Sequence, residues 1–198
     1  MTWGSFNALE TILTFFFQRV QGLNAIQSSL RFLPAPVSGA ILNIAIGTVV
    51  HRINANYLVT GGVLTSAIAP LVMVFAKPHS NFWSTAFLAN IFNPVSADVL
   101  FTVANLLITS VFPPKTQGLA GGVFNTISQI GKSVGLALVA VIAATVTKES
   151  DFTDKESPRA LLQGYIATFW FCFGLILATL AISVWGLRRV GKVGHKKE

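Results

Sequence analysis

The sequence is poor in charged residues, and this excludes most soluble proteins. Only 11% of its 198 residues are charged, whereas 53% are hydrophobic. Soluble domains average about 25% charged residues, and a soluble domain of this size leaves roughly a third of its surface wet. A disordered chain is excluded as well, because disorder requires low hydrophobicity. The composition therefore predicts an integral membrane protein.

Cysteine and catalytic motifs are also scarce. The single cysteine, Cys172, lies in an apolar run and cannot form an internal disulfide. The three histidines, His51, His79 and His195, are far apart and lack metal-ligand spacing. No G-x-S-x-G, Walker or Cys-x-x-Cys pattern occurs. We therefore expect a protein that is not an enzyme and that binds neither a metal nor a cofactor.

The net charge of +7 is concentrated at one end of the chain. Residues 188–198 carry a cluster of basic side chains, namely Arg188, Arg189, Lys192, Lys196 and Lys197. A basic segment directly after a spanning helix favours the cytoplasmic side of a membrane. We therefore predict a cytoplasmic basic tail and no nucleic-acid partner.

Long apolar runs predict an all-α protein with six membrane-spanning helices within residues 1–190. A span needs about 20 mostly apolar residues. The first run is short and contains Glu10. The fourth and fifth runs are longer than a bilayer requires, and tilt, a kink at Pro94 or extension past the headgroups could accommodate the excess. An even number of spans together with a cytoplasmic tail places both termini in the cytoplasm. The predicted spans are residues 3–17, 33–50, 57–76, 82–112, 119–147 and 164–187.

Charged residues occur in only three of these spans, as Glu10, Asp98 and Lys132. A charge at the centre of a span costs about 2.5–3.5 kcal/mol and normally faces a bundle interior or a cavity. Polar neighbours recur at helical spacing around each charge. One interpretation is a cavity lining; the other is a structural hydrogen-bond cluster with an Asp98–Lys132 ion pair. The three stripes are Asn7, Glu10 and Thr14; Asp98, Thr102, Asn105 and Thr109; and Gly121, Asn125, Gln129 and Lys132.

Small residues recur at every fourth position in the second span, as Gly39, Asn43 and Gly47. Such spacing is typical of close helix packing in membranes. The same pattern would also suit a surface that slides during transport.

The segments NPVSADVLFTVANLLITSVFPPK and QGLAGGVFNTISQIGKSVGLA resemble the C-terminal half of fungal major facilitator superfamily transporters. The similarity is greatest to the fourteen-span drug:proton antiporter branch. Gly47, His51 and Arg52 resemble a cytoplasmic Gly-x3-Asp-Arg gating motif, with His51 in place of the aspartate.

The resemblance implies a six-helix bundle built as two inverted three-helix repeats. Spans one and four would line the cavity, two and five would flank the interface between transporter halves, and three and six would face lipid. Asp98, and after it Glu10, would carry the proton, and Lys132 would tune Asp98 or bind an anionic group. Cavity-lining roles would fall to Asn125, Gln129, Thr102 and Asn105.

The implied function is the export of small amphipathic molecules in exchange for protons. We expect the chain to be half of such a transporter, placed in the plasma membrane rather than the vacuolar membrane. Its partners would be the lipid bilayer, the substrate, protons, and an N-terminal half or a second copy. The alternative is a truncated membrane protein or interaction module that does not transport.

Overall fold

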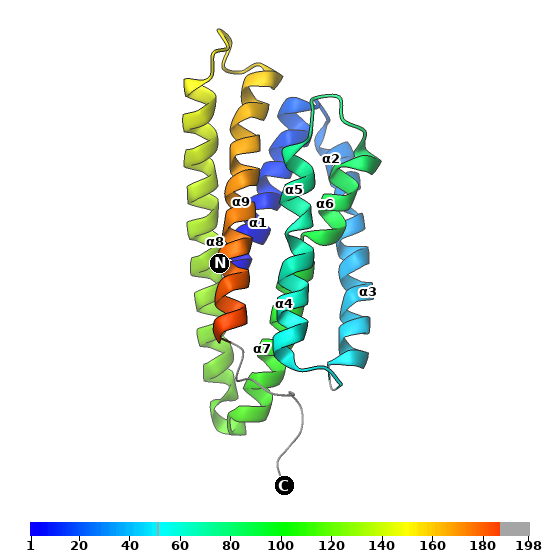
Figure 1. The fold of residues 1–198 in the computed structure, drawn as a ribbon, viewed down its shortest axis with the longest axis vertical. Coiled ribbons are helices and arrows are strands. Elements are labelled where there is room, and N and C mark those ends of the chain that lie inside the picture. The colour runs from blue at the N-terminus through cyan, green and yellow to red at the C-terminus, as the bar shows by residue number, and fades with distance from the viewer. Residues whose placement is uncertain (51, 187–198) are drawn as a thin grey trace.

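The computed structural model describes residues 1–50 and 52–186. All regular structure in these ranges is helical, and the helices run up and down beside one another (Figure 1). The elements in chain order are α1 (Thr2–Phe15), η1 (Phe16–Val20), α2 (Ala25–Phe32), α3 (Pro34–Val49), α4 (Ala55–Ser66), α5 (Ile68–Val74), η2 (Phe82–Ser84), α6 (Ala86–Phe92), α7 (Val95–Val111), α8 (Pro114–Glu149) and α9 (Pro158–Gly186).

Five segments of the described chain are long and apolar enough to cross a bilayer. They correspond to the second through sixth predicted spans and are Ala25–Val49, Ala55–Val74, Phe82–Val111, Pro114–Glu149 and Pro158–Gly186. The first predicted span is also helical, as α1 and the first residues of the π-helical η1, and it contains the charged residue Glu10. Its apolar side chains, such as Leu13 and Phe16, are fully buried against the other helices.

The second segment begins earlier than the sequence predicted. Asn24 caps α2 by accepting a 2.8 Å hydrogen bond from the Gln27 backbone N–H, and the Gln27 side chain accepts from the Asn24 N–H. This capping box starts a helix at Ala25 instead of at residue 33. Pro34 then occupies the first position of α3, where a backbone N–H is not required.

Of the three ways to accommodate the long fourth run, the structure has an interruption at Pro94, because α6 ends at Phe92 and α7 begins at Val95. Ser66 lies at the neighbouring break between α4 and α5, and its side chain supplies hydrogen bonds to the backbone groups on both sides of the Pro94 break. Its hydroxyl donates to the Phe92 carbonyl at 3.1 Å and accepts from the Ser96 N–H at 2.8 Å. A freed backbone group inside a membrane needs such a partner, because no water is available there.

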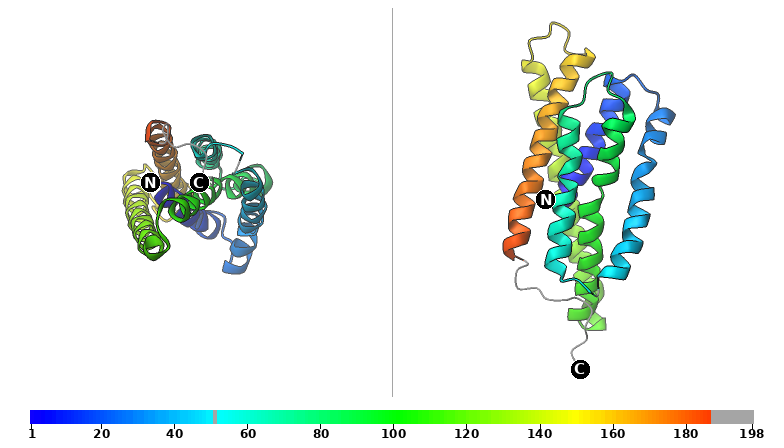
Figure 2. Two further views of the ribbon diagram at one scale, coloured as in Figure 1. Left: turned by 90° about the horizontal axis from the view of Figure 1, so that it is seen from below. Right: turned by 45° about the vertical axis from the view of Figure 1, so that its right-hand side comes forward.

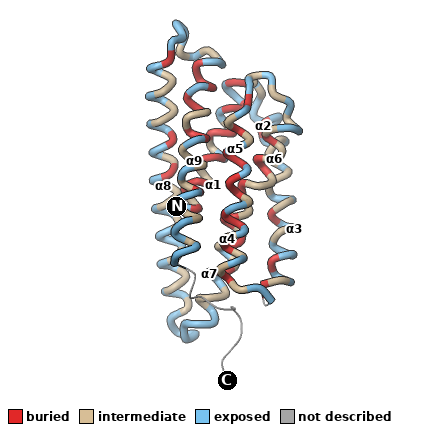
Figure 3. The backbone as a smooth tube through the Cα atoms, viewed as in Figure 1, coloured by how far each residue is buried: buried red, intermediate tan, exposed pale blue. Residues whose placement is uncertain are grey.

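Helices α3 and α8 lie at the two sides of the bundle, with α7 between them (Figure 2, left). Each buries few of its residues: Gly39 and Ile46 in α3, and Gly135 and Val139 in α8. The buried side chains lie mainly on α1, α4, α5 and α9 (Figure 3). The helices predicted to flank the interface therefore keep broad uncovered faces.

Helix α1 crosses α8 at a point where both helices carry glycine residues. A Cβ atom placed on Gly135 would lie 2.6 Å from the Gly4 Cα, and one on Gly4 would lie 2.6 Å from the Gly131 carbonyl oxygen. Backbones approach this closely only where small residues face each other. The crossing brings the α1 stripe beside Lys132, which directly follows Gly131.

Candidate functional site

A polar cleft lies between α1, α7 and α8, with a volume of about 400 Å³. Helix α8 supplies most of its wall, and α1 and α7 close the remaining sides. The lining residues are Trp3, Asn7, Phe101, Asn105, Gly121, Phe124, Asn125, Ser128, Gln129 and Lys132.

Six members of the predicted polar stripes line this cleft, Asn7 and Gly121 among them. Four of the six are the residues to which the sequence gave a cavity or proton role: Asn105, Asn125, Gln129 and Lys132. Their side chains make no hydrogen bond to other described residues, and the three amides are exposed. A structural hydrogen-bond cluster would instead join these groups across the helices. The arrangement favours the cavity-lining interpretation at this point of the bundle, although the roles of the individual residues stay predictions.

Lys132 interacts electrostatically with Glu10, which lies across the α1–α8 crossing. The alternative ion pair between Asp98 and Lys132 is not present among the described residues, because no electrostatic contact links them. The reason is the orientation of each helix about its own axis, which turns Lys132 of α8 toward α1 and Asp98 of α7 toward α3. The cleft therefore has one positive group on its wall and one negative group beside it.

Asp98 and Thr102 belong to a second polar cluster, between α3 and α7. A Cβ atom placed on Gly39 would lie 3.1 Å from the Asp98 Oδ2, so the carboxylate packs directly against the α3 backbone. One turn away, the Thr102 hydroxyl donates to the Asn43 Oδ1 at 3.3 Å. Within the described ranges no side chain hydrogen-bonds the Asp98 carboxylate, which is only partly buried.

The remaining hydroxyls of the predicted stripes do not reach another helix. Thr14 donates to the Glu10 carbonyl at 3.0 Å, and Thr109 donates to the Asn105 carbonyl at 3.0 Å. Both bonds stay within their own helix, as threonine commonly does when apolar surroundings offer no other acceptor. These two threonines therefore take no part in either polar cluster.

Aromatic rings form the apolar part of the cleft, and the sequence did not reveal them as such. The Trp3 and Phe101 ring centroids are 6.3 Å apart in an edge-to-face arrangement, and Phe101 lies 6.3 Å from Phe124. The Trp3 indole N–H is buried without a hydrogen-bond acceptor in the described chain. Helical spacing from Asn7 could have placed Trp3 on the same face of α1, since the two lie four residues apart.

The gating-like motif lies at the end of α3. Gly47 and Arg52 are exposed, and the Arg52 N–H donates to the Val49 carbonyl at 2.9 Å. His51 and the basic tail at 188–198 lie outside the described residues, so the predictions made for them stand as expectations.

The sequence profile described as Major Facilitator Superfamily matches residues 1–136 and 40–198. The chain is 37% identical to "MFS-type transporter 1" of Pyricularia oryzae, an alignment covering 98% of this chain and 34% of that protein. It is 21% identical to "Efflux pump terJ" of Aspergillus terreus, covering 92% of the chain and 34% of that protein. A third relative is the "Low affinity ammonium transporter" of Saccharomyces cerevisiae, at 22% identity over 87% of the chain and 32% of that protein. The chain thus spans about a third of the length of these relatives.

Proposed function

This chain belongs to the major facilitator superfamily, and from that premise we propose that its cleft between α1, α7 and α8 is part of a path for small molecules across the membrane. The protein is integral to the membrane and crosses it several times. The observation that carries the proposal is the set of unpaired amides at Asn105, Asn125 and Gln129, together with Lys132, on one cleft wall. Polar groups are costly in a membrane unless they serve a cavity or a partner.

The chemistry of the cleft supports a small amphipathic substrate. The rings of Trp3, Phe101 and Phe124 offer flat apolar surface, and the amides offer both donors and acceptors. Lys132 adds a positive charge that favours a substrate with an anionic or strongly polar group. Relatives named as efflux pumps support export as the direction of transport.

Proton coupling requires a carboxylate that gains and loses a proton during the cycle. We assign this role first to Asp98, which lies partly buried against Gly39 without a cation or a hydrogen-bond donor among the described residues. Glu10 is the second candidate. Its charge faces Lys132, so protonation of Glu10 would release Lys132 to a substrate anion. The two carboxylates would then act in different clusters, one at the α3–α7 contact and one at the cleft.

The uncovered faces of α3 and α8 support a second domain beside this one. Alternating access in this superfamily requires two halves that rock about a central site, and we infer that this chain forms one of them. We therefore propose that α3 and α8 contact an N-terminal half in the working transporter, and that the plasma membrane is its location.

The decisive experiment compares two lysines of the same helix. We expect Lys132→Met, made in the transporter that contains this chain and reconstituted into vesicles with an imposed proton gradient, to lower gradient-driven transport of an amphipathic dye by about tenfold or more, since one charge-assisted contact is lost. Lys148→Met is the matched control, because Lys148 is exposed near the end of α8 and away from the cleft. Equal activity of the two variants would rule out the cleft as the substrate path. A wild-type protein without gradient-dependent transport would instead favour a non-transporting interaction module.

A further inference from the structure

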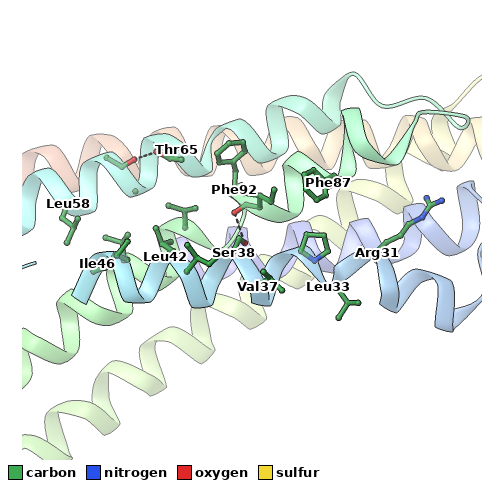
Figure 4. A pocket seen from close by; sticks show the side chains of 18 of the residues that line it. Arg31, Leu33, Val37, Ser38, Leu42, Ile46, Leu58, Thr65, Phe87 and Phe92 are labelled. Atoms are coloured by element: carbon green, nitrogen blue, oxygen red, sulfur yellow. Dashed lines mark hydrogen bonds between the residues drawn. The ribbon is translucent and has the colours of Figure 1, made fainter. Parts of the chain in front are cut away.

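A second hollow, larger and almost entirely apolar, runs between α3 and α4. Its volume is about 1090 Å³, and the α6–α7 segment forms its floor (Figure 4). Side chains such as Val37, Leu42, Leu58 and Phe87 line it. It shares no lining residue with the polar cleft, so it is a separate feature that the proposed transport path does not use.

The hollow exists because α3 and α4 do not pack together. In an inverted repeat of three helices, the α3–α4 pair corresponds to the α8–α9 pair. Helix α8 packs extensively on α9, and a Cβ atom on Gly164 of α9 would meet the Ala143 carbonyl oxygen at 2.6 Å. Between α3 and α4, by contrast, a Cβ atom on Gly61 would meet no atom within 4 Å. One repeat therefore keeps an open groove where the other has a closed helix pair.

The ends of the groove match the two faces of a bilayer. Tyr57 lies at one end and is 69% exposed, and Trp83 lies at the other end and is 67% exposed. Exposed tyrosine and tryptophan are typical of the boundary between hydrocarbon and headgroups. The 16 residues of α3 between these ends span about 24 Å, close to the thickness of the hydrocarbon core.

A single positive charge, Arg31, stands at the Trp83 end of the groove (Figure 4). Its guanidinium lies over the Phe17 and Phe82 rings, with centroids at 5.4 and 5.3 Å, and donates a hydrogen bond to the Gln21 side chain. These contacts fix the group in place, and no carboxylate pairs with it in the described chain. A guanidinium has five N–H donors, so it retains donors for an anion.

We propose that the groove binds one phospholipid, with an acyl chain along α3 and α4 and its phosphate held by Arg31. An apolar channel of nearly bilayer length suits a long apolar occupant, and an arginine that keeps free N–H donors at its end suits an anionic group. A phospholipid has a long apolar chain with an anionic phosphate at one end, which matches an apolar groove with Arg31 at one end. A protein helix would instead bring a row of side chains and no phosphate. Arginine also matches phosphate geometry through paired hydrogen bonds.

The test uses two photoactivatable lipids with identical acyl chains that carry a diazirine: a phosphatidylcholine and a diacylglycerol. Each is added to the protein in an uncharged maltoside detergent, and crosslinked peptides are mapped by mass spectrometry. We expect the phosphatidylcholine to label the walls of α3 and α4, with about tenfold higher apparent affinity than the diacylglycerol. Arg31→Gln should remove that preference.

A second pair of variants tests the groove independently of Arg31. Gly61→Leu places a side chain into open space, so it should fill the groove and abolish labelling without disturbing its neighbours. Gly174→Leu is the matched control, since a Cβ there also meets no atom within 4 Å and α9 does not line the groove. Equal labelling by the two lipids would overturn the proposal. An unlabelled groove would overturn it too and would indicate that another protein segment covers this face.

Discussion

The close crossing of α1 and α8 predicts that the same substitution, glycine to alanine, destabilises the protein at one position of α8 and not at another. Gly135→Ala adds a Cβ atom that would lie 2.6 Å from the Gly4 Cα and 2.7 Å from the Gly4 carbonyl oxygen. Both contacts are with backbone, which cannot rotate aside as a flexible side chain can. The two helices must therefore move apart, and the packing around Leu9 and Val139 loosens with them.

The magnitude follows from two opposing effects. Forcing an extra carbon into a packed interface costs about 1–3 kcal/mol, and alanine is better than glycine within a helix by about 0.5–1 kcal/mol. The net loss lies between about 0 and 2.5 kcal/mol, with a midpoint of about 1.25 kcal/mol. For a chain of this size each kcal/mol corresponds to roughly 2–4 °C, so at that midpoint we expect Gly135→Ala to lower the Tm by roughly 2.5–5 °C.

The measurement is the melting temperature of the detergent-purified protein, followed by the loss of the monodisperse peak in size-exclusion chromatography. Gly122→Ala is the matched control: it makes the same substitution in the same helix, and its Cβ meets no atom within 4 Å. We expect that control to be as stable as the parent or slightly more stable. A Gly135→Ala protein that melts no lower than Gly122→Ala would refute the close crossing.

Two further predictions concern the proton carrier and the topology. In a full-length transporter context, and on the role proposed above for Asp98, we expect Asp98→Asn to abolish proton-coupled export yet leave expression unchanged, because no described cation pairs with Asp98; full coupled export by this variant would exclude Asp98 from the mechanism. In a Cys172→Ala background, an impermeant maleimide applied to intact cells should label a cysteine at position 154 and not one at position 196. Cys172 is fully buried, so the Cys172→Ala background is first compared with the parent for folding; the Ser5 hydroxyl keeps its acceptor at the backbone carbonyl of residue 172, at 3.3 Å. Labelling with the opposite pattern would invert the predicted topology.

The polar stripes show how much of the site helical spacing alone can predict. Spacing of three and four residues predicts one face of α8 for Asn125, Gln129 and Lys132, and in the structure all three line one cleft. The α7 stripe was also drawn as one face, yet its members divide between two neighbours. Asp98 and Thr102 face α3, whereas Asn105 faces the cleft. The four members of this stripe spread over about 60° of the helix circumference. A stripe of that width can contact two helices, and only the positions of those helices decide which residue meets which.

Sequence by itself determined the helices, their membrane environment and the family, because each depends on local hydropathy and on residue order within a segment. It also located the break at Pro94, since proline removes a hydrogen bond wherever it occurs. Tertiary structure alone decided that Lys132 faces Glu10 and that Asp98 packs on Gly39. It alone decided that α3 and α4 stand apart around a groove while α8 and α9 close together. Those features depend on the rotation and separation of helices distant in the chain, which the pattern within any one helix does not specify.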